Sequence, residues 1–333
     1  MTELATVDSV EILVLVDNAT DTLSTVPSYV ENELPRLLRR GLKRLSGRCL
    51  CCAAHGLSLA ITARRGDVER TLLFDTGPDA WVFERNVDRL GFDMATVDGM
   101  ALSHGHWDHG GAMVRALEMI QLASGGRPVP TYMHPGMYRT RAMKMPDGSM
   151  RPFDDVPTAA MLEQQGALVV HATEPLSVLD GLFHVSGEIP RVTSFEPGLP
   201  GQFRRTEDGS GWEPDSLLVD ERYVAVRVKE RGVLVFTACS HAGVVNVMLD
   251  AREHFPGSPL FGVMGGFHLS GANERIIPET VEALRDGAPS TPFMKFGDTV
   301  RIEMLDRQGS SLFGAIEQRI ERQAESCGVG GFG

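Results

Sequence analysis

Apolar and polar positions along the chain follow two different periods. Short runs of β-branched and apolar residues, bounded by turn residues, predict strands. The predicted strands are residues 10–16, 57–63, 71–74, 99–102, 129–134, 168–171, 182–186, 223–229, 233–237 and 260–264. Apolar residues at helical spacing predict helices over residues 80–90, 112–123, 243–254 and 278–284. This alternation indicates a mixed α/β chain, and no internal repeat of about 20 to 50 residues is visible.

Two segments carry weaker patterns. Between residues 27 and 47, leucines recur at helical spacing within a basic stretch, which predicts a surface helix or an ordered insertion. We interpret its basic residues as a solvated face, with anion binding as the minor alternative. The Met- and Pro-rich run over residues 137–157 predicts a loop, where we expect substrate contacts or a lid.

The composition narrows the class of protein. With 333 residues, 42% hydrophobic and 23% charged, the chain can form the folded core of one large domain or two ordinary ones. Its 44 acidic residues outnumber the 32 basic ones, which gives a net charge of −12. Because this charge repels polyanions, we expect a small-molecule substrate and neither nucleic-acid nor membrane partners. The oligomeric state is not readable from the sequence.

Cysteine usage and the first residues indicate a compartment. The five cysteines are odd in number and unevenly spaced, which favours reduced thiols over structural disulfides. The first residues are acidic where a signal peptide is basic. The apolar run over residues 12–16 is much shorter than the roughly 20 residues of a membrane span. We therefore expect a cytoplasmic protein.

The chemistry is concentrated in one motif, His104-x-His106-x-Asp108-His109, between a predicted strand and a predicted helix. In a loop, His104 and His106 can turn to one side and chelate one ion, while Asp108 and His109 face a second. Imidazole and carboxylate suit zinc, iron or manganese, and two such ions can share a hydroxide held at neutral pH by its lowered pKa. The alternative to a metal site is that these four polar residues merely cap the following helix, but such a cluster rarely occurs by chance.

This motif is the H-x-H-x-D-H signature of the metallo-β-lactamase superfamily, which the chain resembles over about residues 10–288. The strand that ends at Asp75 and the strand over residues 233–237 resemble further landmarks of that superfamily. Within it, the chain is similar to the branch that contains the archaeal 7,8-dihydropterin-6-ylmethyl-4-(β-D-ribofuranosyl)aminobenzene-5′-phosphate synthase. The segments that carry this likeness are residues 15–18, 55–59, 103–106, 187–191, 239–241 and 265–269.

The resemblance implies a fold and a cofactor. The fold is a four-layer αββα sandwich, an α/β (α+β) architecture formed by residues 1–290, with the ions at one edge. The cofactor is a pair of divalent metal ions, with zinc as the first choice and iron or manganese as alternatives. The implied metal ligands are His104, His106, Asp108, His109, His241 and His268. Asp108 is also the implied catalytic residue.

Other residues are candidates to support a ligand or to contact the substrate. Cys239 lies near the place where many relatives have a bridging Asp, so it is either a thiolate ligand or a plain buried cysteine. Asp75 is expected to hold a ligand histidine through its second ring nitrogen. Similar roles, with ordinary structural ones as the alternative, are open to Asp17, Asn18, His134, Glu188 and Arg191.

A second cluster, Cys49, Cys51 and Cys52 with His55, has the composition of a zinc knuckle. It lacks a second pair of ligands at useful spacing, so packed free thiols are the favoured interpretation. The chain has neither a dinucleotide-binding fingerprint nor a G-x-S-x-G nucleophile turn.

The resemblance breaks near residue 290. Relatives in the branch continue into a strand with a His-Cys-Thr-Gly segment, whereas this chain has no histidine after His268. Residues 291–320 instead resemble the C-terminal strands of the fumarylacetoacetate hydrolase family, which predicts an atypical, β-hairpin-like tail over residues 291–333. Our hypothesis is a junction of two unrelated genes near residue 288. Loss of the missing segment would weaken one metal site, since losing a ligand or its support typically costs about 10- to 100-fold in metal affinity.

Together these features predict a di-metal-dependent hydrolase that acts on a small metabolite, a phosphoester, lactone or related compound, through a metal-bound hydroxide. One alternative is the condensation catalysed by the synthase of the similar branch. A metal-binding protein with little turnover and a two-iron redox protein are further alternatives.

Overall fold

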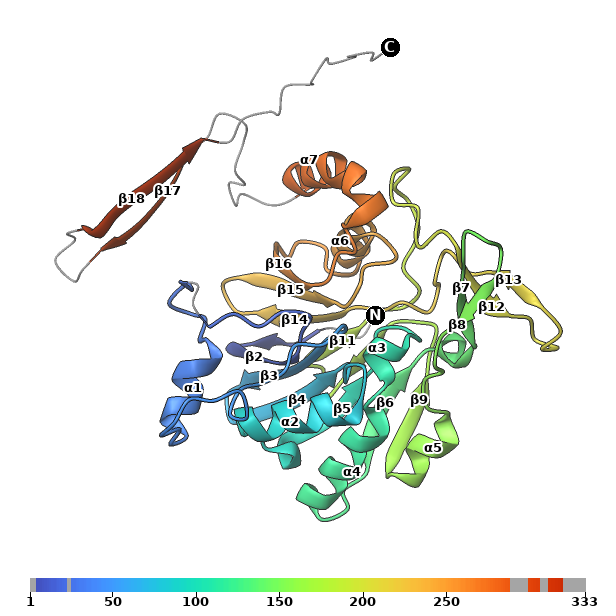
Figure 1. The fold of residues 1–333 in the computed structure, drawn as a ribbon, viewed down its shortest axis with the longest axis horizontal. Helices are drawn as coiled ribbons and strands as arrows, with labels where there is room; N and C mark the ends of the chain where they lie inside the picture. The colour runs from blue at the N-terminus through green and yellow to red at the C-terminus, as the bar shows by residue number, and fades with distance from the viewer. Residues whose placement is uncertain (1–3, 23–24, 288–298, 306–310, 320–333) are drawn as a thin grey trace, which may run out of the picture. The chain divides into compact units, whose positions relative to one another are not determined.

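The computed structural model describes residues 4–22, 25–287, 299–305 and 311–319 (Figure 1). Contacts divide the chain into two units, Met1–Ala283 and Leu284–Gly333. The first unit holds two six-stranded sheets and a small third sheet.

The first sheet of the larger unit has the strand order β2-β3-β4-β5-β6-β9. Its strands are β2 (Ser9–Val16), β3 (Ser58–Arg65), β4 (Val68–Phe74), β5 (Val97–Ala101), β6 (Val129–Met133) and β9 (Ala167–His171). β2, β3 and β4 pair antiparallel, whereas β4, β5, β6 and β9 run parallel. Because parallel strands end at the same edge of a sheet, the loops after β4 and β5 are neighbours.

The second sheet has the order β10-β11-β14-β15-β16, with β1 paired to β14. Its strands are β1 (Thr6–Val7), β10 (Leu176–Val178), β11 (Phe183–Val185), β14 (Val224–Val228), β15 (Gly232–Thr237) and β16 (Leu260–Gly265). β15 and β16 run parallel, so the loops that follow them also meet at one edge.

Helices cover the outer faces of the two sheets (Figure 1). The helices are α1 (Glu33–Arg39), α2 (Ala80–Leu90), α3 (Trp107–Gly110), α4 (Met113–Ser124), α5 (Ala159–Gln164), α6 (Val244–His254) and α7 (Ile277–Gly287). Phe83 of α2 and Leu117 of α4 pack on the first sheet, and Val247 of α6 packs on the second. Phe74 and Phe236 belong to the apolar layer between the sheets. The architecture is therefore the expected αββα sandwich.

Local chemistry explains why the α2 prediction matches the structure at both ends. The Asp79 carboxylate accepts hydrogen bonds from the N–H groups of Trp81 and Val82, which caps the first turn. Gly91 ends the helix in the left-handed conformation, with φ of 60°. Every predicted strand and the three other predicted helices also correspond to elements of the structure.

The prediction of a loop over residues 137–157 is wrong. The segment forms β7 (Arg141–Lys144) and β8 (Met150–Pro152). They join β12 (Gln202–Arg205) and β13 (Trp212–Pro214) in a third, antiparallel sheet of order β13-β12-β7-β8. These strands are three or four residues long. β7 pairs with β8 on one side and, on the other, with β12, about 60 residues later, so the local pattern carries little of their signal.

The segment over residues 27–47 is helical only at Glu33–Arg39, where Leu37 is the buried residue. The leucine spacing continues beyond the helix, but Leu38 and Leu45 are exposed. Three 3₁₀ turns complete the larger unit: Met94–Thr96, Pro135–Tyr138 and Gly271–Ile276. Among the described residues, the helices are all too short or too polar to cross a membrane.

The smaller unit contains an antiparallel pair of strands, β17 (Thr299–Leu305) and β18 (Ser311–Arg319). Within the tail predicted over residues 291–333, residues 291–298, 306–310 and 320–333 lie outside the described residues.

Candidate metal centre

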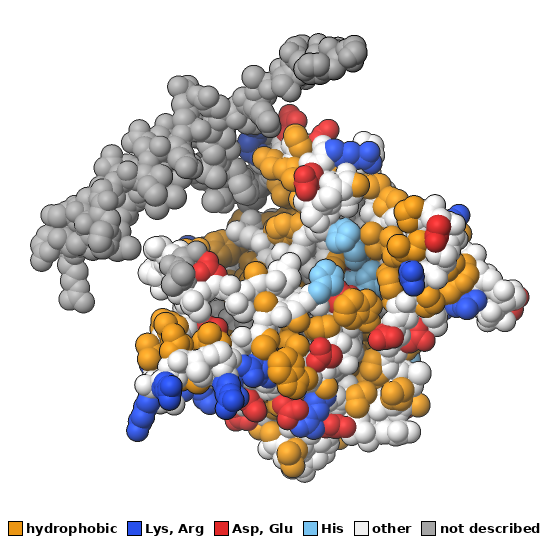
Figure 2. Space-filling view, in the orientation of Figure 1, with side chains coloured by type: hydrophobic (Ala, Val, Ile, Leu, Met, Phe, Trp, Pro, Cys, Tyr) orange, Lys and Arg blue, Asp and Glu red, His pale blue; other side chains and the backbone are white. Residues whose placement is uncertain are grey.

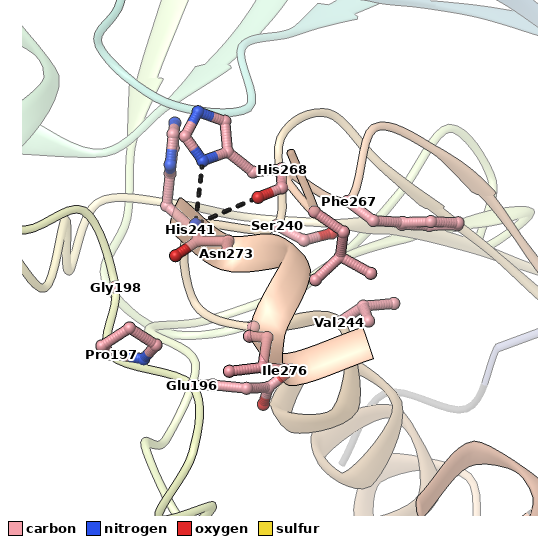
Figure 3. A pocket seen from close by; sticks show the side chains of 12 residues that line it. Glu196, Pro197, Gly198, Ser240, His241, Val244, Phe267, His268, Asn273 and Ile276 are labelled. Atoms are coloured by element: carbon pink, nitrogen blue, oxygen red, sulfur yellow. Dashed lines mark hydrogen bonds between the residues drawn. The ribbon is translucent and has the colours of Figure 1, made fainter. Parts of the chain in front are cut away.

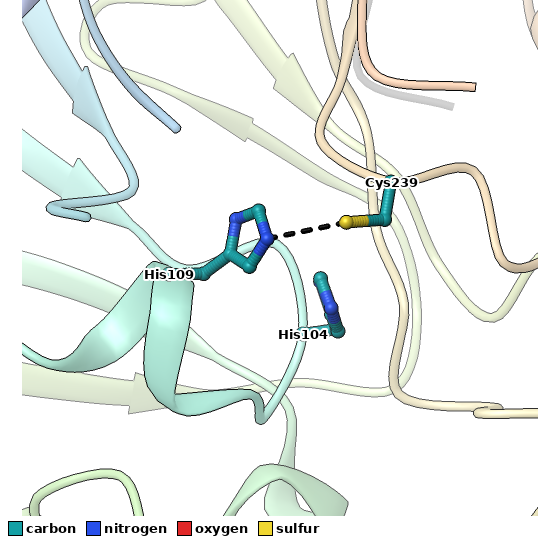
Figure 4. A group of neighbouring side chains, drawn as sticks. All are labelled: His104, His109 and Cys239. Atoms are coloured by element: carbon teal, nitrogen blue, oxygen red, sulfur yellow. Dashed lines mark hydrogen bonds between the residues drawn. The ribbon is translucent and has the colours of Figure 1, made fainter. Parts of the chain in front are cut away.

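Loops that follow β5 and β15 bring histidines from distant parts of the chain together. Two overlapping groups of side chains have their ligand atoms within 4.8 Å of one another. One group is His104, His109 and Cys239 (Figure 4), and the other is His104, His106 and His241. His104 therefore lies between two candidate metal positions.

Asp75 fixes two of these histidines. It follows β4 with a φ of 60°, and its Oδ2 accepts a hydrogen bond from His109 Nδ1 at 2.8 Å. The same oxygen accepts from the Ser103 hydroxyl at 2.7 Å, and the Ser103 Oγ lies 2.9 Å from His104 Nδ1. Because both Nδ1 atoms are engaged as donors, the Nε2 atoms of His104 and His109 are the ring nitrogens that face the centre. Asp75 thus contacts His109 directly and His104 through Ser103.

His106 has a different orientation. Its Nδ1 lies 2.9 Å from His104 Nε2, and its Nε2 lies 2.7 Å from the side-chain oxygen of Gln202 at the start of β12. The ring of Phe153 packs edge-on against the imidazole, with ring centroids 5.6 Å apart. The third sheet and the segment beside it therefore form the wall behind His106.

Gly105, between the first two histidines, is held by charged groups. Its N–H donates to Asp220 Oδ2 at 2.9 Å, and its carbonyl accepts from Arg141 Nη1 at 3.0 Å. A Cβ at this position would lie 2.2 Å from the Met137 carbonyl oxygen, so the loop requires glycine here. Arg141 also pairs with Asp215 and Asp220 at 2.8 and 2.7 Å, so each nitrogen of this buried guanidinium has a partner.

His241 enters the cluster from the loop after β15. Its ring centroid lies 4.8 Å from that of His104 and 5.1 Å from that of His106. The Glu221 carboxylate accepts hydrogen bonds from the backbone N–H groups of His241 and Ala242, which fixes the turn. Both ring nitrogens of His241 are buried and have no hydrogen-bond partner within the described chain.

His268 follows β16 with a φ of 48°, and its ring centroid lies 4.8 Å from that of His241. The side-chain amide of Asn273 donates to the carbonyl of His268 at 3.0 Å (Figure 3). A pocket opens beside these residues, with apolar lining from Pro197, Val244, Phe267, Leu269 and Ile276. In Figure 2, histidine side chains reach the surface near the middle of the visible face.

Burial sets the charge state of three of the histidines. It lowers the pKa of His104 and of His241 well below the usual value, and the neighbouring histidines lower both further. Burial, then Arg141, lowers the pKa of His106 to about 4. These rings are neutral at pH 7, which is the form that binds metal.

His109 is surrounded by ionisable side chains. Its Nε2 is 3.2 Å from both Cys239 Sγ and Asp108 Oδ2. Burial works against protonation of His109, but Cys239, Asp75 and Asp108 outweigh it and hold its pKa well above the usual value. Burial also opposes ionisation of Asp108, yet the hydrogen bond from His109 and the nearby imidazoles lower the pKa of that carboxyl to about 2. Burial raises the pKa of the Cys239 thiol.

His55 lies at the rim of the centre and was not selected as a site residue from the sequence. Its Nε2 lies 3.5 Å from Asp108 Oδ2, and most of its side chain is exposed. Gly56 permits this approach, since it has a φ of +128° and a Cβ there would lie 1.9 Å from the Asp108 carbonyl oxygen. The available sequence signal was the His-Gly pair within residues 55–59. Gln202, Arg141 and Asp220 had no such motif.

Five candidates from the sequence make other contacts. Asp17 accepts from the N–H of the adjacent Asn18, and both residues are exposed. His134 pairs with Glu188 at 3.1 Å, and its Nδ1 accepts from a backbone N–H two residues later. Arg191 donates to the backbone carbonyl of Ile189 at 2.7 Å. None of these hydrogen bonds among the described residues reaches one of the clustered histidines.

Three other described cysteines, Cys49, Cys51 and Cys52, are free thiols and belong to neither ligand group. Burial, then Glu33, raises the pKa of Cys51 to about 12, so this thiol is neutral and unreactive at pH 7.

Comparisons with known proteins add to this geometry. The search against family models found no match. The chain is 26% identical over 233 residues to the 7,8-dihydropterin-6-methyl-4-(beta-D-ribofuranosyl)-aminobenzene-5'-phosphate synthase of Methanocaldococcus jannaschii, covering 69% of this chain and 76% of that one. An uncharacterized protein of the same organism is 26% identical over 230 residues, 69% of this chain and 78% of the relative. A solved structure described as a metal-dependent hydrolase of the beta-lactamase superfamily superposes with a TM-score of 0.56 at 20% identity, covering 83% of each chain.

Proposed function

We propose, from the premise that this chain has the fold of the metallo-β-lactamase superfamily, that it is a divalent-metal-dependent hydrolase of a small metabolite. The observation that carries this proposal is the pair of ligand groups that share His104. Each group brings three nitrogen or sulfur donors within reach of one ion, and the two groups adjoin.

The residues present fit such ions. His241 is the clearest case, since its two ring nitrogens are buried without a hydrogen-bond partner in the described chain. An unpaired buried nitrogen costs free energy, and metal coordination would supply the missing interaction. The imidazole, carboxylate and thiol donors of the site suit zinc best, with iron or manganese as alternatives.

Three neutral imidazoles, those of His104, His106 and His241, would hold the first ion. The second ion would be held by Asp108, His109 and Cys239, since Asp108 Oδ2 and Cys239 Sγ each lie 3.2 Å from His109 Nε2. His268 lies close by. When bound, such ions supply Lewis acidity, which lowers the pKa of water and stabilises negative charge on oxygen.

The chain's own residues prepare the site for this role. Asp75 keeps the proton of His109 on Nδ1 and, through Ser103, does the same for His104. The Asp108 carboxyl is ionised at neutral pH because its pKa is about 2. The pocket beside His268 has mainly apolar walls, which favour an uncharged part of the substrate there. A phosphoester, a lactone or a related ester is the proposed substrate class.

The test begins with the metal content per chain, measured by plasma mass spectrometry on protein purified without chelator. We expect about two equivalents of zinc and turnover on a panel of esters, lactones and phosphodiesters. His104→Ala/His106→Ala is expected to lose at least one equivalent and all turnover, while His171→Ala, at an exposed position of β9, keeps both. Protein that contains no metal and refuses added zinc, iron and manganese contradicts the proposal.

The 26% identity to the Methanocaldococcus jannaschii synthase supports a second candidate function. In that reaction, a pterin diphosphate condenses with a ribofuranosylaminobenzene phosphate, and pyrophosphate is released. Incubation with these two substrates followed by measurement of pyrophosphate separates the candidates. Pyrophosphate release without hydrolysis of the panel favours the synthase, and the opposite result favours the hydrolase.

A further inference from the structure

Gln202 belongs to no motif, yet it lies in direct contact with a histidine of the centre. Only 1% of the residue is exposed, and its Oε1 lies 2.7 Å from His106 Nε2. Its backbone is fixed on both sides: its N–H donates to the carbonyl of Leu199 at 3.3 Å, and its carbonyl accepts from Asp215 at 3.0 Å. Pairing of Gln202 with Met143 anchors the residue in the third sheet.

An amide oxygen can only accept a hydrogen bond, so His106 Nε2 must be the donor in this contact. A neutral imidazole carries one proton, and the hydrogen bond at one nitrogen determines which nitrogen remains free. The proton on Nε2 therefore leaves the lone pair on Nδ1. That Nδ1 is the atom that lies 2.9 Å from His104 Nε2, inside the ligand group.

We infer that Gln202 is a positioning residue that holds His106 in the Nε2–H tautomer, so that His106 presents Nδ1 to a metal ion. The inference rests on the metal centre of the proposed function. It assigns to the third sheet a role in the chemistry, because the sheet carries the atom that selects the tautomer.

The opposite tautomer would disable two ligands at once. A proton on His106 Nδ1 would point at His104 Nε2, and the 2.9 Å separation would make this a hydrogen bond. Both lone pairs needed for the ion would then be engaged. His104 itself cannot relieve this conflict, since its Nδ1 is committed to Ser103. The Gln202 oxygen prevents this internal pairing.

The nitrogen of the Gln202 side-chain amide supports the same conclusion. Its Nε2 is buried without a hydrogen-bond partner in the described chain, which is unfavourable. Turning the amide over would place this Nε2 beside His106 and would reverse the tautomer. A glutamate at position 202 offers only acceptors, so it preserves the proposed function of the residue whichever way it turns.

The experiment measures the tautomer and the zinc affinity separately. Long-range proton–nitrogen correlation NMR on nitrogen-15 histidine-labelled, chelator-treated full-length protein reports which nitrogen of His106 carries the proton. Zinc affinity is measured by competition with a chromophoric chelator. The variants are Gln202→Leu, Gln202→Glu and, as a matched control on the exposed face of α5, Gln164→Leu.

We expect the Nε2–H tautomer in the wild type, in Gln202→Glu and in Gln164→Leu, and a mixture of tautomers in Gln202→Leu. Zinc affinity should fall about 10- to 100-fold in Gln202→Leu, as for other groups that orient metal ligands, and should be retained in the other two variants. A residue that merely fills space would not be rescued by glutamate.

Two results overturn the inference: an Nδ1–H tautomer in the wild type, or a folded Gln202→Leu variant with wild-type zinc affinity and an unchanged tautomer. Circular dichroism and the urea midpoint establish folding, and Gln202→Met replaces the leucine variant if that variant does not fold. Failure of the wild type to bind zinc would contradict the proposed function, whereas the tautomer in the metal-free protein would still decide this inference.

Discussion

Arg141 and Asp220 hold the Gly105 peptide from opposite sides. Arg141 donates to the glycine carbonyl, Asp220 accepts from the glycine N–H, and the two side chains pair with each other at 2.7 Å. Both side chains are almost fully buried. The backbone between His104 and His106 is thus held by an ion pair whose two members come from other segments of the chain.

Removal of one partner of this ion pair is expected to be costly. Asp220→Ala leaves the Arg141 charge buried with only part of its compensation, which should lower the free energy of unfolding by about 3–5 kcal/mol. Glu84→Ala is the matched control, since it breaks the exposed pair of Glu84 with Arg115 and should cost less than about 1 kcal/mol. Urea denaturation measures both. Equal losses in the two variants would show that the buried pair does not hold the fold.

We expect Asp75 to affect the zinc affinity of the centre. Asp75→Ala removes the acceptor that keeps the protons of His109 and, through Ser103, of His104 on Nδ1. Zinc affinity should fall about 10- to 100-fold in competition with a chelator. Asp67→Ala, at the exposed turn between β3 and β4, should bind zinc as the wild type does. An unchanged affinity in a folded Asp75→Ala variant would refute this role.

Gly56→Ala tests the close approach of the His55 loop to Asp108. Its φ of +128° and the contact at 1.9 Å both oppose a side chain. Gly126 is a control, because it has a φ of +93° with nothing within 4 Å of an added Cβ. Gly126→Ala should lose only the conformational cost of about 1 kcal/mol, whereas Gly56→Ala should lose more and also weaken zinc binding. Equal unfolding free energies for the two variants would contradict the close approach.

His184 should make stability depend on pH. Burial, then His254, lowers the pKa of His184 to about 3, whereas the unfolded chain protonates histidine at about 6.5. The unfolded state therefore binds an extra proton between these values, so the free energy of unfolding falls as the pH drops, by up to about 1.4 kcal/mol per unit. His184→Phe, which can pack with Phe255, should reduce this slope.

The measurement is urea unfolding between pH 7 and pH 4. The ring of His184 faces His254, Tyr223 and Phe255, and Asp250 lies beyond Tyr223. His171→Phe, at an exposed position, controls for the loss of a histidine elsewhere. If the free energy of unfolding has the same pH slope in His184→Phe and in the wild type, His184 is not the residue whose protonation on unfolding causes the slope.

The sandwich could be predicted from the sequence because its elements carry strong local signals. Long apolar runs such as β15 lie between turn residues, and α2 has a capping Asp79 and a terminal Gly91. The histidine motif was also readable, since its members are close together along the chain. The roles of His241 and Asp75 came from their places at strand ends, in the manner of the resembling superfamily.

The third sheet and its contacts could not be predicted in this way. Gln202 and Arg141 belong to strands of four residues whose pairing depends on chain segments about 60 residues apart. Neither residue type is specific to a metal site, so only the folded position reveals the contact. Conversely, His134 and Glu188 had suitable chemistry, but the structure pairs them with each other.

The third sheet also links the candidate centre to both halves of the larger unit. Its β7 and β8 arise between strands of the first sheet, and its β12 and β13 arise between strands of the second. The histidine loop of one half therefore contacts Gln202 and Asp220, which both come from the chain segment of the other half. A half-folded chain would carry the motif without its ligand geometry. The geometry of the candidate centre thus depends on residues from both halves of the larger unit.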